Sequence, residues 1–258
     1  MGITANQIVV DEQPSVRYLP LYNVEGSGPL LIFISGLDGT GQLFFKQSPA
    51  LSRSFRVVTY RSRERGQFTY EDLADDVAAI IRDLGEERAT IVAESFGGGV
   101  ALTFALRHPQ MIDRLVVINS FPRFRNRLQI KLGAWLASAL PFPTLWPMRK
   151  AACILGLWAD GVTKEDRRRF FAAIRTVEGE GYVRRLQLIR DLDIEGQLSQ
   201  IQAPTLFIAA DKDHLIRSVR EARRMAERMP RATVRTVKGA GHACLLGNRV
   251  RLVEMLAE

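Results

Sequence analysis

Short apolar runs recur along the chain between segments that have helical periodicity. The run at 30–34 is apolar at every position, which is typical of a strand covered on both faces of a parallel sheet. Weak alternation at 16–22 predicts an edge strand, because Pro20 cannot donate the hydrogen bond that a central strand requires. Further strands are predicted at 55–60, 90–94, 114–119, 205–209 and 233–237.

Amphipathic segments fill the intervals between these strands. Thr69 and Asp72 have the spacing of a capping box, and apolar residues recur at helical intervals from Leu73 to Leu84, just before Gly85. Further helices are predicted after Ser95, at 219–229 and at the end of the chain. This alternation predicts an α/β fold with a doubly wound, mostly parallel sheet. A catalytic site is expected beyond the carboxyl ends of its strands.

Residues 121–202 interrupt this alternation. The stretch is rich in Trp, Phe, Leu, Pro and Arg; Thr163 with Asp166 predicts the start of one helix, and 182–192 predicts another. We therefore expect a core built from 1–120 and 203–258, with a helical insertion at 121–202. The larger apolar residues of the insertion are expected either to pack in its interior or to line an apolar pocket: Trp135, Phe142, Leu145, Trp146 and Trp158.

Ser95 lies where the predicted strand at 90–94 meets the next helix. A tight turn at this point would hold the serine in a strained backbone conformation, so the residues two before and two after it must be small. Ala93 and Gly97 meet that requirement. The turn would expose the hydroxyl group, and amides at the start of the helix could bind a negatively charged oxygen.

This arrangement resembles the nucleophile elbow of the α/β-hydrolase family, with Ala93 in place of the usual first glycine. The loop at 35–41, Ser-Gly-Leu-Asp-Gly-Thr-Gly, lies where that family has its oxyanion loop, although the family often has His-Gly there. The resemblance implies that the backbone N–H groups of Leu37 and Phe96 bind the oxyanion. It also implies that the insertion is a helical cap between the sixth and seventh strands of the family. The same loop is weakly similar to that of plant plastid esterases, lipases and thioesterases, and for Asp38 we prefer a role in the turn to a catalytic one.

A serine hydroxyl needs a base to accept its proton. The chain has three histidines. His108 ends the helix that starts at the elbow, about three turns from Ser95, and is expected to point away. His214 adjoins the expected acid, whereas His242 follows the last predicted strand, where the family places its base.

The base in turn needs a carboxylate to orient it. Asp211 and Asp213 both follow the strand at 205–209, and the family pattern of a small residue, an Asp and two aliphatic residues favours Asp213. The resulting order, Ser95, Asp213 and His242, is that of the α/β hydrolases. A serine at the elbow argues against epoxide hydrolases and haloalkane dehalogenases, in which the resemblance implies an aspartate.

Composition and charge change this interpretation little. The net charge of +8 is accompanied by no nucleic-acid-binding motif, so the basic clusters at 61–65, 123–127 and 167–169 are expected to be solvated surface. Weak contact with an anionic membrane surface is the alternative. Cys153 and Cys244 lack metal-ligand spacing, which favours reduced thiols without a metal or other cofactor. With no bilayer-spanning run and no signal-peptide pattern, a cytoplasmic location is expected.

Together these patterns predict a serine hydrolase that cleaves a small-molecule carboxylic ester with an apolar acyl or alcohol part. A thioesterase, or an acyltransferase in which an alcohol intercepts the acyl-enzyme, would use the same residues and stays open. A non-enzymatic ligand-binding protein on the same fold is the alternative from a different class. The sequence does not determine the oligomeric state.

Overall fold

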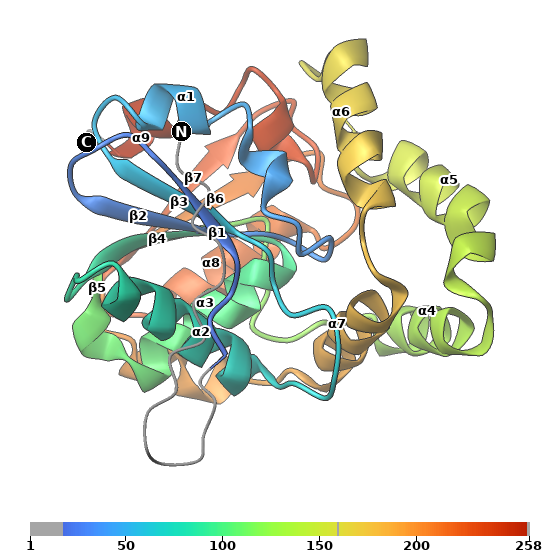
Figure 1. Cartoon of the computed structure of the whole chain (residues 1–258), viewed down its shortest axis with the longest axis horizontal. Coiled ribbons are helices and arrows are strands. Elements are labelled where there is room, and N and C mark those ends of the chain that lie inside the picture. The colour runs from blue at the N-terminus through green and yellow to red at the C-terminus, as the bar shows by residue number, and fades with distance from the viewer. Residues whose placement is uncertain (1–17, 159, 257–258) are drawn as a thin grey trace.

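The computed structural model of the protein describes residues 18–158 and 160–256 (Figure 1). Within these residues one sheet has seven strands in the order β1-β3-β2-β4-β5-β6-β7. Only β1 is antiparallel to its neighbour; the other pairs are parallel. The strands are β1 (Tyr22–Glu25), β2 (Leu30–Ile34), β3 (Arg56–Tyr60), β4 (Ala89–Glu94), β5 (Ile112–Ile118), β6 (Thr205–Ala210) and β7 (Ala232–Val237).

Helices cover both faces of this sheet, as the alternation in the sequence predicts. The helices α2 (Tyr70–Asp83), α3 (Phe96–Arg107) and α8 (Ser218–Ala226) lie on one face, while α1 (Ser48–Leu51) and α9 (Leu252–Leu256) lie on the other (Figure 1). Successive residues of β2 point to opposite faces, so Ile32 packs in one core and Phe33 in the other. This double burial explains why the run at 30–34 is apolar at every position.

Several local predictions are confirmed. Thr69 and Asp72 form a capping box at the start of α2, and Thr163 and Asp166 form a second one at α6. Each cap contributes about 1 kcal/mol to the stability of its helix. The edge strand is displaced: β1 spans Tyr22–Glu25 and pairs with β3, rather than occupying 16–22, of which 16 and 17 lie outside the described residues.

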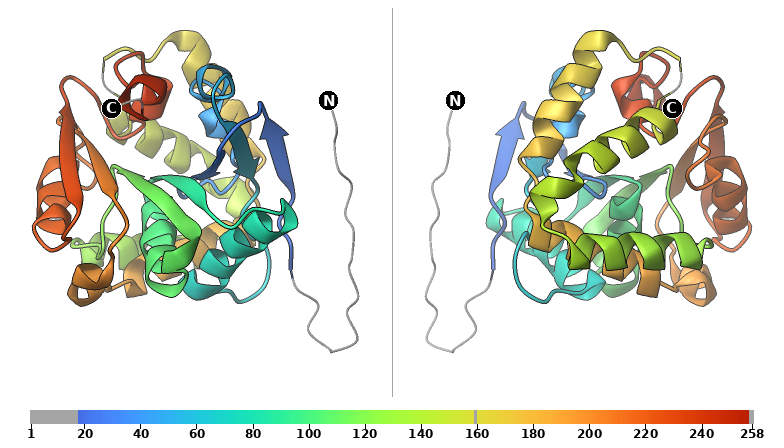
Figure 2. Two further views of the ribbon diagram at one scale, coloured as in Figure 1. Left: turned by 90° about the vertical axis from the view of Figure 1, so that its left-hand side faces the viewer. Right: turned by 90° about the vertical axis from the view of Figure 1, so that its right-hand side faces the viewer.

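The insertion lies between β5 and β6 and forms one side of the molecule (Figures 1 and 2). Among the described strands, the insertion follows the fifth and precedes the sixth. The strand numbering of the family places it between the sixth and seventh strands, one strand later. The insertion contains α4 (Arg127–Ala139), a short 3₁₀ turn (Phe142–Leu145), α5 (Trp146–Gly156), α6 (Lys164–Arg175) and α7 (Gly179–Asp191). None of the helices in the described part of the chain has both the length and the apolarity to cross a bilayer.

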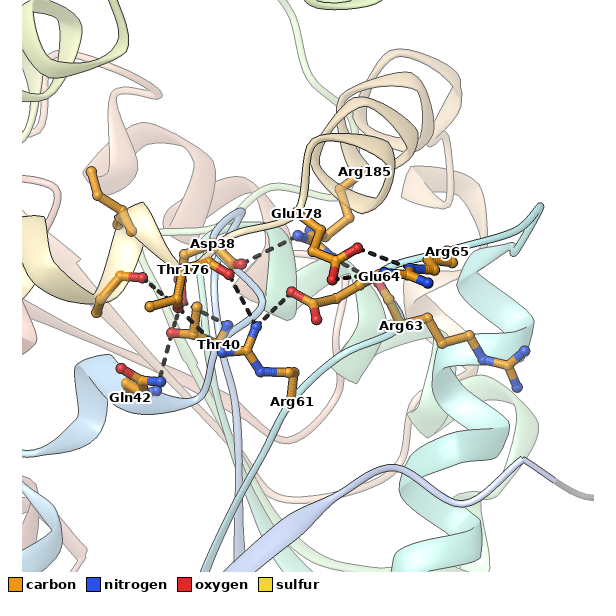
Figure 3. Close-up of polar contacts among 12 residues, drawn as sticks. Asp38, Thr40, Gln42, Arg61, Arg63, Glu64, Arg65, Thr176, Glu178 and Arg185 are labelled. Carbon is orange, nitrogen blue, oxygen red and sulfur yellow. Dashed lines mark hydrogen bonds and ion pairs between the residues drawn. The ribbon is translucent and has the colours of Figure 1, made fainter. Parts of the chain in front are cut away.

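The basic cluster at 61–65 is not simply solvated surface, which corrects the expectation from the sequence. Arg63 binds the buried carboxylate of Asp76 through two hydrogen bonds of 2.8 and 2.7 Å. Arg65 forms an ion pair with Glu178, at the start of α7, with an N–O distance of 2.9 Å (Figure 3). Arg63 is therefore anchored within the core, and Arg65 links the core to the insertion.

Candidate active site

Ser95 lies in a strained turn between β4 and α3. Its φ of 55° is in the left-handed region, which costs a residue with a side chain about 1–3 kcal/mol. Hydrogen bonds fix the backbone on both sides of this turn: Ser95 N donates to Ile118 O (2.9 Å), and Ser95 O accepts from Ser120 Oγ (2.6 Å). A Cβ on Gly97 would lie 2.5 Å from the carbonyl oxygens of Ile34 and Ser35, so only glycine fits there.

The structure brings Ser95, His242 and Asp213 together from loops that are far apart in the sequence. His242 Nε2 lies 2.9 Å from Ser95 Oγ, and His242 Nδ1 lies 2.7 Å from Asp213 Oδ2. Asp213 also accepts hydrogen bonds from the N–H groups of Leu215 (2.9 Å) and Ile216 (3.3 Å) and from the hydroxyl of Ser218. The imidazole is therefore held between a hydroxyl and a carboxylate that is itself fixed by further donors.

Electrostatic attraction strengthens the contact between His242 and Asp213. Burial lowers the pKa of His242, but the negative charge of Asp213 and the hydrogen bond with it outweigh burial and raise that pKa above 6.5. Burial raises the pKa of Asp213, yet the interaction with His242 and the donated hydrogen bonds hold it below its usual value. At neutral pH Asp213 is therefore ionised and keeps the imidazole proton on Nδ1.

Asn119 connects the elements that carry these residues. It follows β5 at a φ of 45°, and its side-chain amide donates to the carbonyl oxygen of His242 (2.7 Å) and accepts from Ala210 N (2.9 Å). One buried side chain thus ties the end of β6 to the histidine loop. The sequence placed Asn119 at a strand end, and its polar side chain there is the signal that could have identified it.

The loop after β2 runs directly beside the elbow. A Cβ on Gly36 would lie 3.5 Å from Ser95 Cβ, which places the Leu37 peptide next to the serine. Phe96 is the first residue of α3, so its N–H is not needed for the helical hydrogen-bond ladder. The oxyanion loop and the start of α3 therefore both adjoin Ser95, and the binding of an oxyanion by the N–H groups of Leu37 and Phe96 stays a prediction.

Arg185, which the sequence analysis did not single out, extends from α7 to this loop (Figure 3). Its guanidinium is fully buried and donates to the carbonyl oxygens of Leu37 (2.9 Å), Asp38 (3.2 Å) and Arg63 (2.9 Å). Burial lowers the pKa of Arg185 to about 10, so the side chain stays charged at neutral pH. Nothing in the sequence distinguishes Arg185 from its neighbour Arg184.

Glu94 is a second residue that the sequence analysis left without a role. Its side chain is buried beside the elbow, and among the described residues no group forms a hydrogen bond with its Oε1. Burial raises the pKa of Glu94 to about 8, with the negative charges of Asp38 and Asp213 acting in the same direction and His242 opposing them. Glu94 is therefore mostly protonated at neutral pH and adds little negative charge beside the imidazole.

The remaining candidate side chains have other partners or are exposed. His108 contacts Asp75, with an Nε2–Oδ1 distance of 2.7 Å, at the far end of α3, as expected. His214 is exposed. Asp211 accepts from Gly239 N (2.7 Å), which supports the histidine loop, and Asp38 accepts from Thr40 N (2.8 Å) in a turn.

Comparisons with known proteins agree with this fold. A family model described as the alpha/beta hydrolase fold matches residues 29–248. A protein of Caulobacter sp. (strain K31), named as a carbamate hydrolase, RutD, is 28% identical, with 86% of this chain and 88% of that protein covered. The structure of a hydrolase from Pseudomonas aeruginosa superimposes with a TM-score of 0.75 at 27% identity, covering 86% of each chain. The enol-lactonase of Burkholderia xenovorans LB400 also gives 0.75, at 24% identity, with 86% and 88% covered.

The wound parallel sheet and the match over most of the chain define a hydrolase of the α/β class. The chain belongs to the α/β-hydrolase fold family.

Proposed function

We propose that the protein hydrolyses a carboxylic ester, with Ser95 as nucleophile, His242 as general base and Asp213 as the group that orients the base. The observation that carries the proposal is the line of two hydrogen bonds, 2.9 Å from Ser95 Oγ to His242 Nε2 and 2.7 Å from His242 Nδ1 to Asp213 Oδ2. The serine that ends this line is half-buried and lies in a positive-φ turn. This geometry suits attack on a carbonyl carbon.

In the first step Ser95 Oγ bonds to the ester carbonyl carbon while its proton passes to His242 Nε2. The carbonyl oxygen becomes an oxyanion, which the N–H groups of Leu37 and Phe96 bind. The tetrahedral intermediate then collapses, and the bond to the alcohol oxygen breaks. His242 Nε2 returns the proton to that oxygen, so the alcohol leaves neutral and the acyl group stays on Ser95.

In the second step a water molecule repeats the same chemistry. His242 accepts a proton from the water while the oxygen of the water bonds to the acyl carbon. Collapse of the second tetrahedral intermediate breaks the bond to Ser95 Oγ, which regains its proton from His242. Throughout, the ionised Asp213 stabilises the imidazolium, in line with the raised pKa of His242.

Residues 121–202 are proposed to act as a cap that supplies an apolar substrate pocket. Leu145 is buried, and Phe142, Trp146 and Trp158 pack against an apolar cluster around α6. Trp135 departs from the expectation for this group, because it is 64% exposed and lies on the outer surface. The apolar interior of the cap supports a substrate with an apolar acyl or alcohol part.

A carbamate is the second candidate substrate class, favoured by the relatives named as carbamate hydrolases. A carbamate carbonyl could be attacked by the same serine and its oxygen bound by the same amides. The product of the first step would then be a carbamoyl-enzyme instead of an acyl-enzyme. Comparing p-nitrophenyl esters with p-nitrophenyl carbamates separates the two, since both release the same chromophore.

The proposal is tested by the hydrolysis of p-nitrophenyl esters from acetate to palmitate, together with labelling by a fluorophosphonate. We expect turnover and covalent labelling of Ser95, and loss of both in Ser95→Ala. His242→Ala should lose turnover, whereas His214→Ala, which alters an exposed histidine, is the matched control and should keep it. Wild-type protein that hydrolyses no ester and resists labelling would favour a ligand-binding role, and an added alcohol that captures the acyl group would indicate an acyltransferase.

A further inference from the structure

Large apolar side chains are exposed on the outer helices of the insertion. The described residues expose eleven of them, and seven lie between 128 and 155: Leu128, Leu132, Trp135, Leu140, Met148, Ile154 and Leu155. The exposed fraction reaches 86% at Leu155 and 79% at Leu128. Singly scattered apolar residues are normal on a protein surface, but so many on two successive helices favour a contact surface.

The two outer helices present these side chains on the faces that do not pack. In α4 the buried residues Ile130, Ala134 and Ala137 belong to one face, and α4 packs on α7. Leu128, Leu132 and Trp135 follow at i, i+4 and i+7 and form the opposite face. This apolar stripe of α4 is therefore turned away from the body of the insertion.

The helix α5 also exposes apolar side chains, and over more of its surface than α4. It has no buried residue, and only its half-buried side, which includes Trp146 and Cys153, packs against the apolar cluster around α6. Met148, Ile154 and Leu155 are exposed on the rest of its surface. In both views of Figure 2 and in Figure 1, α4 and α5 form the layer of the insertion farthest from the sheet. We call the exposed side of this layer the outer face.

The charge of the outer helices has a single sign. Residues 127–156 include four basic residues and no aspartate or glutamate, although the whole chain contains 28 acidic residues. Lys131 and Lys150 are exposed among the apolar side chains. Lys131 and Trp135 also line a hollow of about 570 Å³ between α4 and α7, where α7 contributes Gln187 and the ion-paired Arg190 and Asp191. An apolar surface bordered by lysines and a tryptophan has the chemistry of helices that lie in the interface of an anionic bilayer.

We propose that the outer face docks on the surface of a bilayer that contains anionic phospholipid, with α4 and α5 lying in the interface. The competing occupant is a second copy of the chain, but a two-fold contact through this face would set the basic residues of one copy against those of the other. Lipid phosphates supply the opposite charge. Because no described helix could span the bilayer, the association is peripheral. It does not depend on the chemistry proposed for Ser95.

The test is co-sedimentation of the whole protein with phosphatidylcholine vesicles, with and without phosphatidylglycerol. We expect clear binding to the anionic vesicles and binding roughly thirty-fold weaker to the neutral ones, since the two exposed lysines are attracted to lipid phosphates. Added salt should weaken the binding. The tryptophan emission should shift to shorter wavelength on binding, and Trp135→Phe should remove most of that shift.

A pair of variants separates docking by the outer face from unspecific adhesion. Leu132→Ser removes a leucine that is 54% exposed on α4, and Leu21→Ser removes one that is 55% exposed beside the edge strand β1. We expect the first change to weaken vesicle binding roughly ten-fold and the second by less than about two-fold. Since neither leucine is buried, thermal unfolding should show that both variants remain folded.

Three results would overturn the proposal. The first is that the wild-type protein binds neither kind of vesicle, and the second is that the two leucine variants bind equally well. Alternatively, sedimentation velocity without lipid could show a dimer that Leu132→Ser dissociates, which would assign the outer face to a second copy of the chain.

Discussion

At the carboxyl ends of the strands, polar side chains are buried and held by partners on several elements. Asp213 is 3% exposed and accepts hydrogen bonds from two backbone amides, a hydroxyl group and an imidazole. On α4 and α5 the relation is reversed, because large apolar side chains such as Leu155 are exposed and contact little. A buried polar group is costly to leave without its partners, whereas an exposed apolar group is not costly to remove. The first region is therefore suited to fixed geometry and the second to contact with another surface.

Arg185 is on α7, which lies between these two regions. It is part of the insertion, yet its guanidinium lies under the loop beside Ser95 and holds three carbonyl oxygens. Arg65 reaches in the other direction, from the core to Glu178. Contacts of this kind fix the inner helices α6 and α7 to the core and leave the outer helices for other partners.

Among variants that test this comparison between the strand ends and the outer helices, Asp213→Asn should have the largest effect. An asparagine amide would donate to His242 Nδ1, move the imidazole proton to Nε2 and so remove the acceptor for the serine proton. We expect kcat/KM for p-nitrophenyl esters to fall about 10⁴-fold. Asp211→Asn, which alters an exposed carboxylate nearby, is the control and should cost less than about ten-fold. Vesicle binding should be unchanged in both, and a similar loss of activity in the two variants would contradict the assigned roles.

Arg185→Met tests the residue that connects the two regions. Methionine has a similar size but leaves three carbonyl oxygens without their donor, at about 1 kcal/mol each, so unfolding in urea should show a loss of about 3 kcal/mol. If the guanidinium positions the Leu37 amide, kcat should fall about 100-fold with little change in KM, because the oxyanion exists only in the transition state.

The control for that variant is Arg184→Met. Arg184 is the preceding residue of α7 and donates to the carbonyl oxygen of Phe68 (2.6 Å), away from the oxyanion loop. We expect it to lower stability without selectively lowering kcat. Arg185→Lys keeps the charge but not the planar group of donors, and it should restore part of the lost kcat. If Arg185→Met, Arg185→Lys and Arg184→Met all have the same kcat, the role of Arg185 is structural.

Glu94→Gln tests a buried carboxyl group at the strand ends whose Oε1 has no hydrogen-bond partner among the described residues. The folded-state pKa of about 8 lies above the usual value of 4.5, so the native protein keeps a proton that the unfolded chain releases. The stability of the wild type should therefore fall as the pH rises from 4.5 to 8. Glutamine cannot ionise, and the difference in unfolding free energy between variant and wild type should grow by about 4 kcal/mol across this window.

Urea unfolding at several pH values measures this difference, because other titrating groups cancel between the two proteins. Glu165→Gln is the control, since that carboxylate is exposed and forms an ion pair with Arg168 on the same helix. Its difference from the wild type should not change with pH. A Glu94→Gln curve parallel to that of the wild type would mean that the pKa of Glu94 is not raised.

The sequence was most informative where local signals coincide with the tertiary structure. The strand at 30–34 was predictable because every residue must be apolar when both faces are covered, and the start of α2 because Thr69 and Asp72 make their hydrogen bonds locally. Ser95, Asp213 and His242 were selected because they match the α/β-hydrolase pattern in the segments that follow three strands, and parallel strands end at one edge of a sheet. The structure places the three side chains within hydrogen-bonding distance, and their catalytic role stays a prediction.

Features that depend on the packing of distant elements were not predictable. Arg184 and Arg185 are neighbours of the same type, and only the position of α7 under the loop makes one of them buried. Similarly, α4 is apolar on both its packed and its exposed faces, so periodicity could not show that Trp135 faces outward. Charge counts alone also failed for Arg63 and Arg65, whose carboxylate partners lie on α2 and α7.

Leu155→Ser should have the smallest effect and tests the comparison from the side of the outer face. Leu155 is 86% exposed, so the serine variant should change the free energy of unfolding by less than about 0.5 kcal/mol and the turnover of p-nitrophenyl acetate by less than about two-fold. Leu145→Ser alters a leucine of the same insertion that is 3% exposed, and a loss of about 3 kcal/mol is expected there. Urea unfolding of the two variants beside the wild type measures both changes. A large loss of stability in Leu155→Ser would mean that this side chain packs within the protein, and the outer face would then no longer be a surface left for a partner.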